Sequence, residues 1–120
     1  MPNQQPWTDM PQHACVIVPV GSFEQHGPHL PLNTDEVIAT AVAETALVGA
    51  PSNLNLWLLP TLAYTKSNEH AWSPGTVWLS PTTLLAVLDD IGRSVAKTQA
   101  RKLVFFNGHG GNSEIGRAHV

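Results

Sequence analysis

The fold is decided by the stretch Gly21-Ser-Phe-Glu-Gln-His-Gly-Pro-His-Leu-Pro-Leu-Asn-Thr-Asp35, which joins an apolar run to the start of a helix. The preceding run, Ala14-Cys-Val-Ile-Val-Pro-Val20, is mostly apolar and β-branched, as is typical of a strand buried on both faces. After the stretch, Asn33 can cap a helix whose third position is Glu36, which is the spacing of a capping box. The polar stretch is therefore predicted to follow the carboxyl end of a strand, where open α/β sheets bind ligands.

The rest of the sequence alternates helical and strand patterns. A helix is predicted from Thr34 to about Val48, and its apolar positions at helical spacing are Val37, Ala41, Ala43, Ala46 and Leu47. A second helix is predicted to begin at Pro81 with Ser80 as its N-cap. The remaining expected segments are an irregular arm over 1–13, a strand over 54–59, a long connection over 60–80, a strand over 102–106 and a helix from residue 114.

The order of these elements predicts the fold class. Strands separated by helices pair in parallel through right-handed crossovers, which gives a three-layer α/β fold with a parallel central sheet. Residues 1–120 are interpreted as one partial domain, because the pattern stops after the third strand and the beginning of the helix from Glu114. That truncation leaves the apolar residues Val104, Phe105 and Phe106 short of cover, so we expect marginal stability or association.

Composition excludes several classes of function. The net charge is −3, and the six Lys and Arg residues do not cluster, so the chain lacks a nucleic-acid footprint. Apolar runs are too short for a membrane span, and residues 1–13 lack the apolar core of a signal peptide. The single cysteine, Cys15, falls in a predicted buried strand, which favours a reducing, cytoplasmic location. Six histidines exceed what a core needs and indicate sites.

The polar stretch holds candidate metal ligands. Glu24, His26 and Asp35 offer the oxygen and imidazole donors that suit Zn, Mn or Fe. Glu24 and His26 are two residues apart, so an extended backbone points both side chains the same way. His109 follows the third predicted strand, and the parallel topology brings its glycine-flanked loop to the same edge of the sheet. A carboxylate shared by two ions would allow a two-metal site.

Other interpretations of these residues stay open at the level of sequence. Glu24 and His26 are also compatible with solvated loop positions, and His29 with a residue that holds the loop by hydrogen bonds. Ser67 and His70 either contact substrate or order the long connection. Nothing in the sequence indicates a nucleophile elbow, a phosphate loop or a redox thiol.

Three motifs resemble those of the creatininase (creatinine amidohydrolase) family, in the same order. They are Pro-Val-Gly-Ser-Phe-Glu-Gln-His-Gly-Pro-His-Leu-Pro-Leu-Asn-Thr-Asp at 19–35, Ser-Pro-Gly-Thr at 73–76 and Asn-Gly-His-Gly-Gly-Asn at 107–112. The resemblance implies a three-layer α/β enzyme with two divalent metals, Zn or Mn and in some members Fe. The implied reaction is hydrolysis of a non-peptide, often cyclic, amide C–N bond of a small molecule by metal-bound hydroxide. It also implies a homo-oligomer.

Position by position, the resemblance implies roles for individual residues. Glu24 and His109 would bind one metal, His26 the other, and Asp35 would bridge them, which makes Asp35 and Glu24 the expected catalytic residues. Ser67 aligns with a substrate-contacting serine, and His70 and Gly110 are further expected substrate contacts.

The chain departs from the family pattern in two respects. Gly111 stands where creatininase proper has a glutamate, and the sequence resembles only the amino-terminal half of family members. Two alternatives therefore accompany the amidohydrolase hypothesis. The chain is a catalytically inactive fragment or subunit, or it is a relative that acts as a formamide deformylase or a peptide-trimming peptidase. A third reading, a small-molecule binding module, predicts affinity without turnover.

Overall fold

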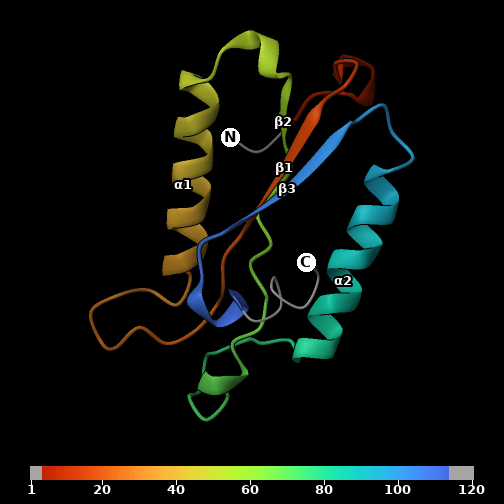
Figure 1. Cartoon of the computed structure of the whole chain (residues 1–120). Coiled ribbons are helices and arrows are strands. Elements are labelled where there is room, and N and C mark those ends of the chain that lie inside the picture. Colours follow the sequence, from red (N-terminus) through yellow and green to blue (C-terminus); the bar gives the residue numbers. More distant parts are fainter. Residues whose placement is uncertain (1–3, 114–120) are drawn as a thin grey trace.

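The computed structural model describes residues 4–113 and places a three-stranded sheet between two long helices (Figure 1). The elements follow in the order β1 (Cys15–Val20), α1 (Thr34–Gly49), β2 (Leu56–Leu58), α2 (Pro81–Val95) and β3 (Lys102–Asn107). Both strand pairs are parallel, and the spatial order β2-β1-β3 makes the first strand the central one. The predicted α/β fold with a parallel sheet is therefore confirmed.

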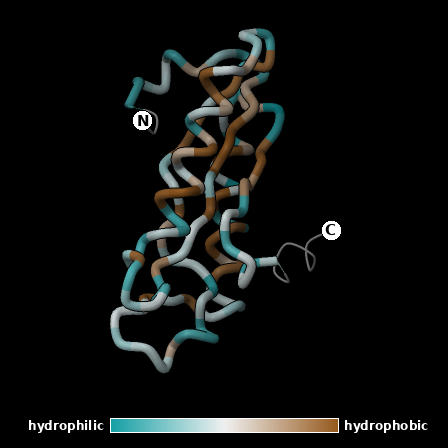
Figure 2. Tube along the Cα trace, turned by 90° about the vertical axis from the view of Figure 1, so that its left-hand side faces the viewer, coloured by the Kyte–Doolittle hydropathy of each residue, from teal (hydrophilic) through white to brown (hydrophobic). Residues whose placement is uncertain are grey.

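The main core lies between the sheet and α2. Val16 and Val18 of β1 are buried together with Trp57 of β2, and Ile91 and Val95 of α2 pack against this cluster. Figure 2 shows the same organisation, with apolar segments through the middle of the molecule and more hydrophilic loops beyond the carboxyl ends of the strands. This core fixes β1 between its neighbours, so the residue that follows β1 has a defined position.

The predicted buried stripe of α1 is largely wrong. Ala39 and Ala43 are the buried residues of this helix, whereas Val37, Ala41 and Ala46 are exposed. Small side chains face the sheet because the approach is close: a Cβ atom added at Gly108 would lie 2.9 Å from the Cβ atom of Ala39. Since α1 is apolar on most sides, the spacing of its apolar residues does not identify the buried face.

Element boundaries follow the predictions with small corrections. The expected strand over 54–59 is shorter, because residues 52–54 form a 3₁₀ turn and Asn55 adopts a left-handed backbone with a φ of 54°. The third strand matches and extends by one residue, Asn107. The arm over 1–13 contains a 3₁₀ turn, Trp7–Asp9, and the long connection contains another, Asn68–His70. The helix predicted from residue 114 lies outside the described residues.

The two predicted helix caps differ in outcome. The Ser80 hydroxyl accepts a hydrogen bond from the Thr83 N–H at 3.2 Å, which confirms the N-cap of α2. Asn33 precedes α1 but makes no capping hydrogen bond, so the predicted capping box is wrong. Instead, the Thr34 hydroxyl donates to the carbonyl oxygen of Pro31 at 2.6 Å.

Strand β3 exposes two of the three apolar residues that were predicted to lack cover. Val104 and Phe106 remain 43% and 36% exposed, and they pair in register with Ile17 and Pro19 of β1. Phe105 faces the other way and packs against the core.

The structure also bears on the predictions from composition. Within residues 4–113, no helix combines the length and apolarity that crossing a membrane requires. Cys15 is a free thiol, but it is only partly buried, so its predicted place in the core is wrong. It sits at the first position of β1, where the sheet begins.

Candidate metal centre

Three loops meet beyond the carboxyl ends of the strands, at the lower end of the molecule in Figure 1. The Gly108 N–H donates to the Val20 carbonyl at 2.7 Å, which ties the loop after β3 to the end of β1. The Gly21 N–H donates to the Leu62 carbonyl at 2.9 Å and joins the long connection to the same point. This is the edge of the sheet at which the sequence predicts a site.

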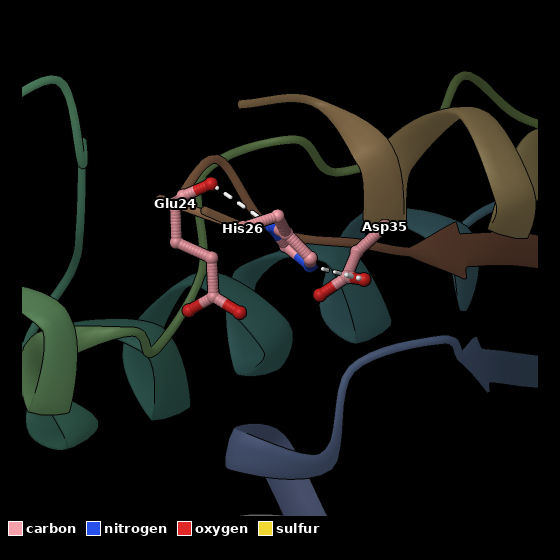
Figure 3. Close-up of side chains that lie close together, drawn as sticks. All are labelled: Glu24, His26 and Asp35. Atoms are coloured by element: carbon pink, nitrogen blue, oxygen red, sulfur yellow. Dashed lines mark hydrogen bonds and ion pairs between the residues drawn. The ribbon is translucent and has the colours of Figure 1, made fainter. Parts of the chain in front are cut away.

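His26 lies between two oxygen atoms (Figure 3). Its Nδ1 atom is 3.0 Å from the backbone carbonyl oxygen of Glu24, and its Nε2 atom is 3.1 Å from Oδ1 of Asp35. Burial acts to lower the pKa of His26, but the Glu24 carbonyl and the Asp35 carboxylate outweigh it and raise the pKa above its ordinary value. The position therefore attracts positive charge.

His109 is arranged in the same way on the other side of Asp35. Its Nε2 atom is 3.1 Å from the carbonyl oxygen of Lys66. Its Nδ1 atom is 3.0 Å from Oδ2 of Asp35 and 3.3 Å from Oε1 of Glu24. Each carboxylate oxygen of Asp35 thus faces one histidine.

These contacts fix which nitrogen of each histidine is free to bind a metal. A carbonyl oxygen only accepts hydrogen bonds, so the ring nitrogen that faces it carries the proton. In the neutral rings, lone pairs on Nε2 of His26 and Nδ1 of His109 therefore point at Asp35. A lone pair and a carboxylate repel each other unless a proton or a cation lies between them. Metal-binding histidines typically donate their other N–H to a backbone carbonyl, so these residues fit a metal.

Glu24 adds an unsatisfied acceptor to the site. Its side chain is buried, and its Oε2 atom accepts no hydrogen bond from the residues that the structure describes. The Nε2 atom of His70 lies 3.7 Å from that oxygen. A buried carboxylate oxygen without a donor is costly, and a cation would remove the cost. Ligand atoms of Glu24, His26 and Asp35 lie within 4.8 Å of one another, a spacing that one ion can span.

The three expected substrate contacts lie around this group in different environments. The Ser67 hydroxyl is fully buried and has no hydrogen-bond partner among residues 4–113. His70 is partly buried, and its Nδ1 atom is 3.4 Å from the side-chain nitrogen of Gln25. Gly110 is exposed, with open space where a side chain would be. Their roles in substrate binding stay predictions.

Sequence reasoning missed three residues at the site. The Ser22 hydroxyl donates to Oδ2 of Asp35 at 2.9 Å, and Oε1 of Glu69 lies 3.6 Å from Nε2 of His109. Asn112 is buried: its side-chain oxygen accepts from the Lys66 N–H and its side-chain nitrogen donates toward the Gly21 carbonyl. Ser22 and Asn112 lie inside the motifs at 19–35 and 107–112, so their place in these motifs could have marked them as site residues. Glu69 stands in the irregular long connection.

Burial and hydrogen bonding have opposite effects on the Glu69 carboxyl. Burial acts to raise its pKa. A hydrogen bond from its own backbone N–H, one from Lys66 and nearby positive charge outweigh burial and hold the pKa below its ordinary value. Glu69 therefore remains an anion beside His109.

Comparison with known proteins gives a consistent family match. The family model described as Creatininase, creatinine amidohydrolase, matches residues 4–120. A mycofactocin precursor peptide peptidase of Mycolicibacterium smegmatis is 52% identical over 107 residues, covering 88% of this chain and 43% of that protein. A creatinine amidohydrolase of Pseudomonas putida is 37% identical over 105 residues, covering 82% of this chain and 39% of that protein.

Solved structures give the same result. A creatininase of Zn–Zn type and a creatininase Mn form each share 33% sequence identity with this chain. Each match covers 86% of this chain and 40% of the other, with TM-scores of 0.74 and 0.73. The chain spans less than half the length of these relatives.

Proposed function

Because the chain belongs to the creatininase family, we propose that it carries the metal site of a hydrolase that cleaves an amide C–N bond. The proposed ligands are Glu24, His26, Asp35 and His109, with Asp35 shared between two ions. Zn or Mn suits this set of carboxylate and imidazole donors, and Fe is a further option. Such ions, when bound, activate water and polarise the amide carbonyl.

One observation carries this proposal: a ring nitrogen of each of two histidines faces a different oxygen of the same carboxylate. The Ser22 hydroxyl is a proton donor to Oδ2 of Asp35. Backbone carbonyls occupy the N–H side of both imidazole rings, so the two neutral histidines turn lone pairs toward the same carboxylate. The arrangement supports a shared cation ligand at Asp35.

The other residues of the chain prepare and orient this site. Ser22 donates to Asp35 and fixes the rotation of its carboxylate. Glu24 brings a second, buried negative charge, which favours cations over neutral ligands. Ser67 and His70 lie on the long connection, and we assign them to substrate binding together with the exposed backbone at Gly110.

The proposed amide substrate is either a peptide or a small cyclic amide. The identity of 52% to a mycofactocin precursor peptide peptidase exceeds the 37% to a creatinine amidohydrolase, which favours a peptide substrate over a small cyclic amide. Both substrates present a C–N bond to be hydrolysed, so the same metal chemistry serves either. We therefore place peptide trimming first and hydrolysis of a non-peptide amide second.

The proposal includes the setting in which the chain works. We propose a homo-oligomer, because apolar side chains remain exposed on α1 and β3. We propose a cytoplasmic location, because the one cysteine is free. Neither nucleic acid nor a membrane is among the proposed partners.

Metal content tests the proposal. Elemental analysis of the chain purified without chelator is expected to find about two divalent ions per chain, and Asp35→Ala is expected to lose both. His29→Ala is the matched control, because His29 is an exposed histidine of the same loop and is expected to leave metal content unchanged. Wild-type metal content in Asp35→Ala would refute the shared-ligand role.

Hydrolysis assays then separate the proposed enzyme from an inactive fragment. The metal-loaded chain is incubated with peptide amides and with creatinine, and released products are measured. Turnover that Asp35→Ala abolishes supports the enzyme. Bound metal without turnover of either substrate supports the fragment or subunit reading.

A further inference from the structure

Glu69 is a charged side chain at the site that the proposed function leaves without a role. Its Oε2 atom accepts a hydrogen bond from Lys66 Nζ at 3.0 Å. Its Oε1 atom lies 3.6 Å from Nε2 of His109. Since Nδ1 of that ring faces Asp35, Glu69 lies on the side of the imidazole away from the proposed metal ligands.

Direct metal binding by Glu69 is the first role to consider. Ligand atoms of Glu24, Glu69 and His109 lie within 4.8 Å of one another, so the spacing alone allows an ion. However, Nε2 of His109 contacts the Lys66 carbonyl and carries the proton of the ring. A cation between Glu69 and His109 would therefore meet an N–H group instead of a lone pair.

We propose that Glu69 is a positioning residue that acts through His109. When Nδ1 of His109 binds a metal, its ring becomes more positive, and the Glu69 carboxylate stabilises that charge from the Nε2 side. The same carboxylate favours the tautomer that keeps the lone pair on Nδ1. This inference rests on the proposed function, because it requires a metal bound beside Asp35 and His109.

Gly111 provides the room that this arrangement needs. A Cβ atom added there would overlap with Oε1 of Glu69 and Nε2 of His109, and it would lie 2.9 Å from the Lys66 carbonyl oxygen. The backbone of Gly111 is outside the left-handed region, so close approach explains the glycine better than conformation does. Any larger residue would push the carboxylate away from the ring.

The first test is the isosteric variant Glu69→Gln in the full chain, titrated with Zn²⁺ in a calorimeter. Gln keeps the size of the side chain and an oxygen that accepts from Lys66, so the variant removes mainly the negative charge. We expect the dissociation constant to rise by about 10- to 100-fold, as is typical for loss of an outer-shell partner, with unchanged stoichiometry. The metal-free variant should melt at the wild-type temperature.

Asp89→Asn is the matched control. Asp89 also forms a side-chain pair within one helical turn, with Arg93 at 2.8 Å, but it lies on the exposed side of α2. We expect this variant to bind Zn²⁺ as the wild type does. An equal loss of affinity in both variants would show that removing any negative charge suffices, and would overturn the specific role of Glu69.

Gly111→Ala tests the same contact from the other side. The added methyl group should displace Glu69 and weaken Zn²⁺ binding, whereas Gly49→Ala, at a position with open space, should not. The added methyl group also meets Nε2 of His109, so the coupling between the two variants is the readout: Glu69→Gln combined with Gly111→Ala should lose less affinity than the sum of the two single losses. Full additivity of the two losses would overturn the proposal.

The outcomes separate this inference from the proposed function. If the wild type binds none of Zn²⁺, Mn²⁺ and Fe²⁺, both are overturned. If the wild type binds and Glu69→Gln binds equally well, only the positioning role fails. If Glu69→Gln loses one bound ion, Glu69 is a direct ligand and the positioning role is overturned. If metal-free stability falls together with affinity, the role of Glu69 is structural and the proposal is overturned as well.

Discussion

Asp35 holds the site together because each of its carboxylate oxygens has its own neighbours. Oδ1 contacts His26, whereas Oδ2 contacts both His109 and the Ser22 hydroxyl. Its place in the first turn of α1 also sets it at the amino-terminal end of that helix. Asp35 thereby connects the start of α1 to both imidazole rings.

Ser22→Ala is expected to weaken metal binding without unfolding the chain. The serine is buried, and its hydroxyl sets the rotation of the Asp35 carboxylate, as an outer-shell partner of a metal ligand does. The expected rise in the Zn²⁺ dissociation constant is about 10- to 100-fold, measured by calorimetry. Ser94→Ala, which removes a hydroxyl that donates to the Asp90 carbonyl on α2, is the control. Unchanged affinity in Ser22→Ala would show that the carboxylate needs no orienting donor.

At the scale of single residues, the sequence predicted donors that stand close together in a motif. Glu24 and His26 lie in the loop after β1, and Asp35 lies in the first turn of the helix that this loop enters, so the strand before them decides where all three emerge. Glu69 was not predictable in this way. Its position depends on the path of an irregular connection, on Lys66 and on the missing side chain at Gly111, and none of these produces a periodic pattern.

At the scale of elements, α1 approaches the end of β3 unusually closely. Gly108 follows β3 directly, and its Cα carries no side chain where Ala39 of α1 packs against it. The approach lets the first turn of α1 place Asp35 beside His109, so helix packing and metal geometry are linked. A helix with larger inward residues would hold Asp35 farther from the loop after β3.

Gly108→Ala is expected to destabilise the chain by about 1–3 kcal/mol, the usual cost of overpacking. The added Cβ would lie 2.9 Å from the Ala39 Cβ atom and 3.4 Å from the Val20 carbonyl oxygen. Urea unfolding measures the effect as a lower midpoint at unchanged slope. Gly49→Ala, in open space at the end of α1, should stay within about 0.5 kcal/mol of wild type. Equal midpoints would mean that α1 can move away at no cost.

The order of strands and helices was predictable from the apolar runs and from the Gly, Pro and Ser residues that begin or end them. The face of α1 was not predictable, because Val37, Ile38 and Val42 are as apolar as the alanines that are buried. In α2 the contrast between apolar and charged sides is strong, and the apolar residues Ile91 and Val95 pack against the core. Periodicity therefore locates a buried face only where the opposite face is polar.

At the scale of the whole molecule, much apolar surface remains exposed on one side of the sheet. Ile38 and Val42 of α1 are 54% and 47% exposed and stand one helical turn apart. Val104 and Phe106 of β3 add to the exposed apolar side chains. Exposed apolar side chains gain free energy when another protein surface covers them.

The chain is expected to self-associate as its concentration rises. Replacing Ile38 and Val42 together by Lys should yield a monomer, because two charges on one helix face oppose burial there. Sedimentation velocity over a range of concentrations measures the effect. Thr45→Lys, at another exposed position of α1, should associate like the wild type. A wild-type chain that stays monomeric at every concentration would contradict the expectation.

The central place of β1 has a consequence for how the chain is made. This strand precedes both helices in the sequence, yet the longer of its two pairings is with β3, which follows both helices. Glu24 and Asp35 are therefore synthesised well before His109. A nascent chain can offer an ion only part of its coordination sphere. The proposed ligand set is thus complete only once β3 and the loop after it have been synthesised.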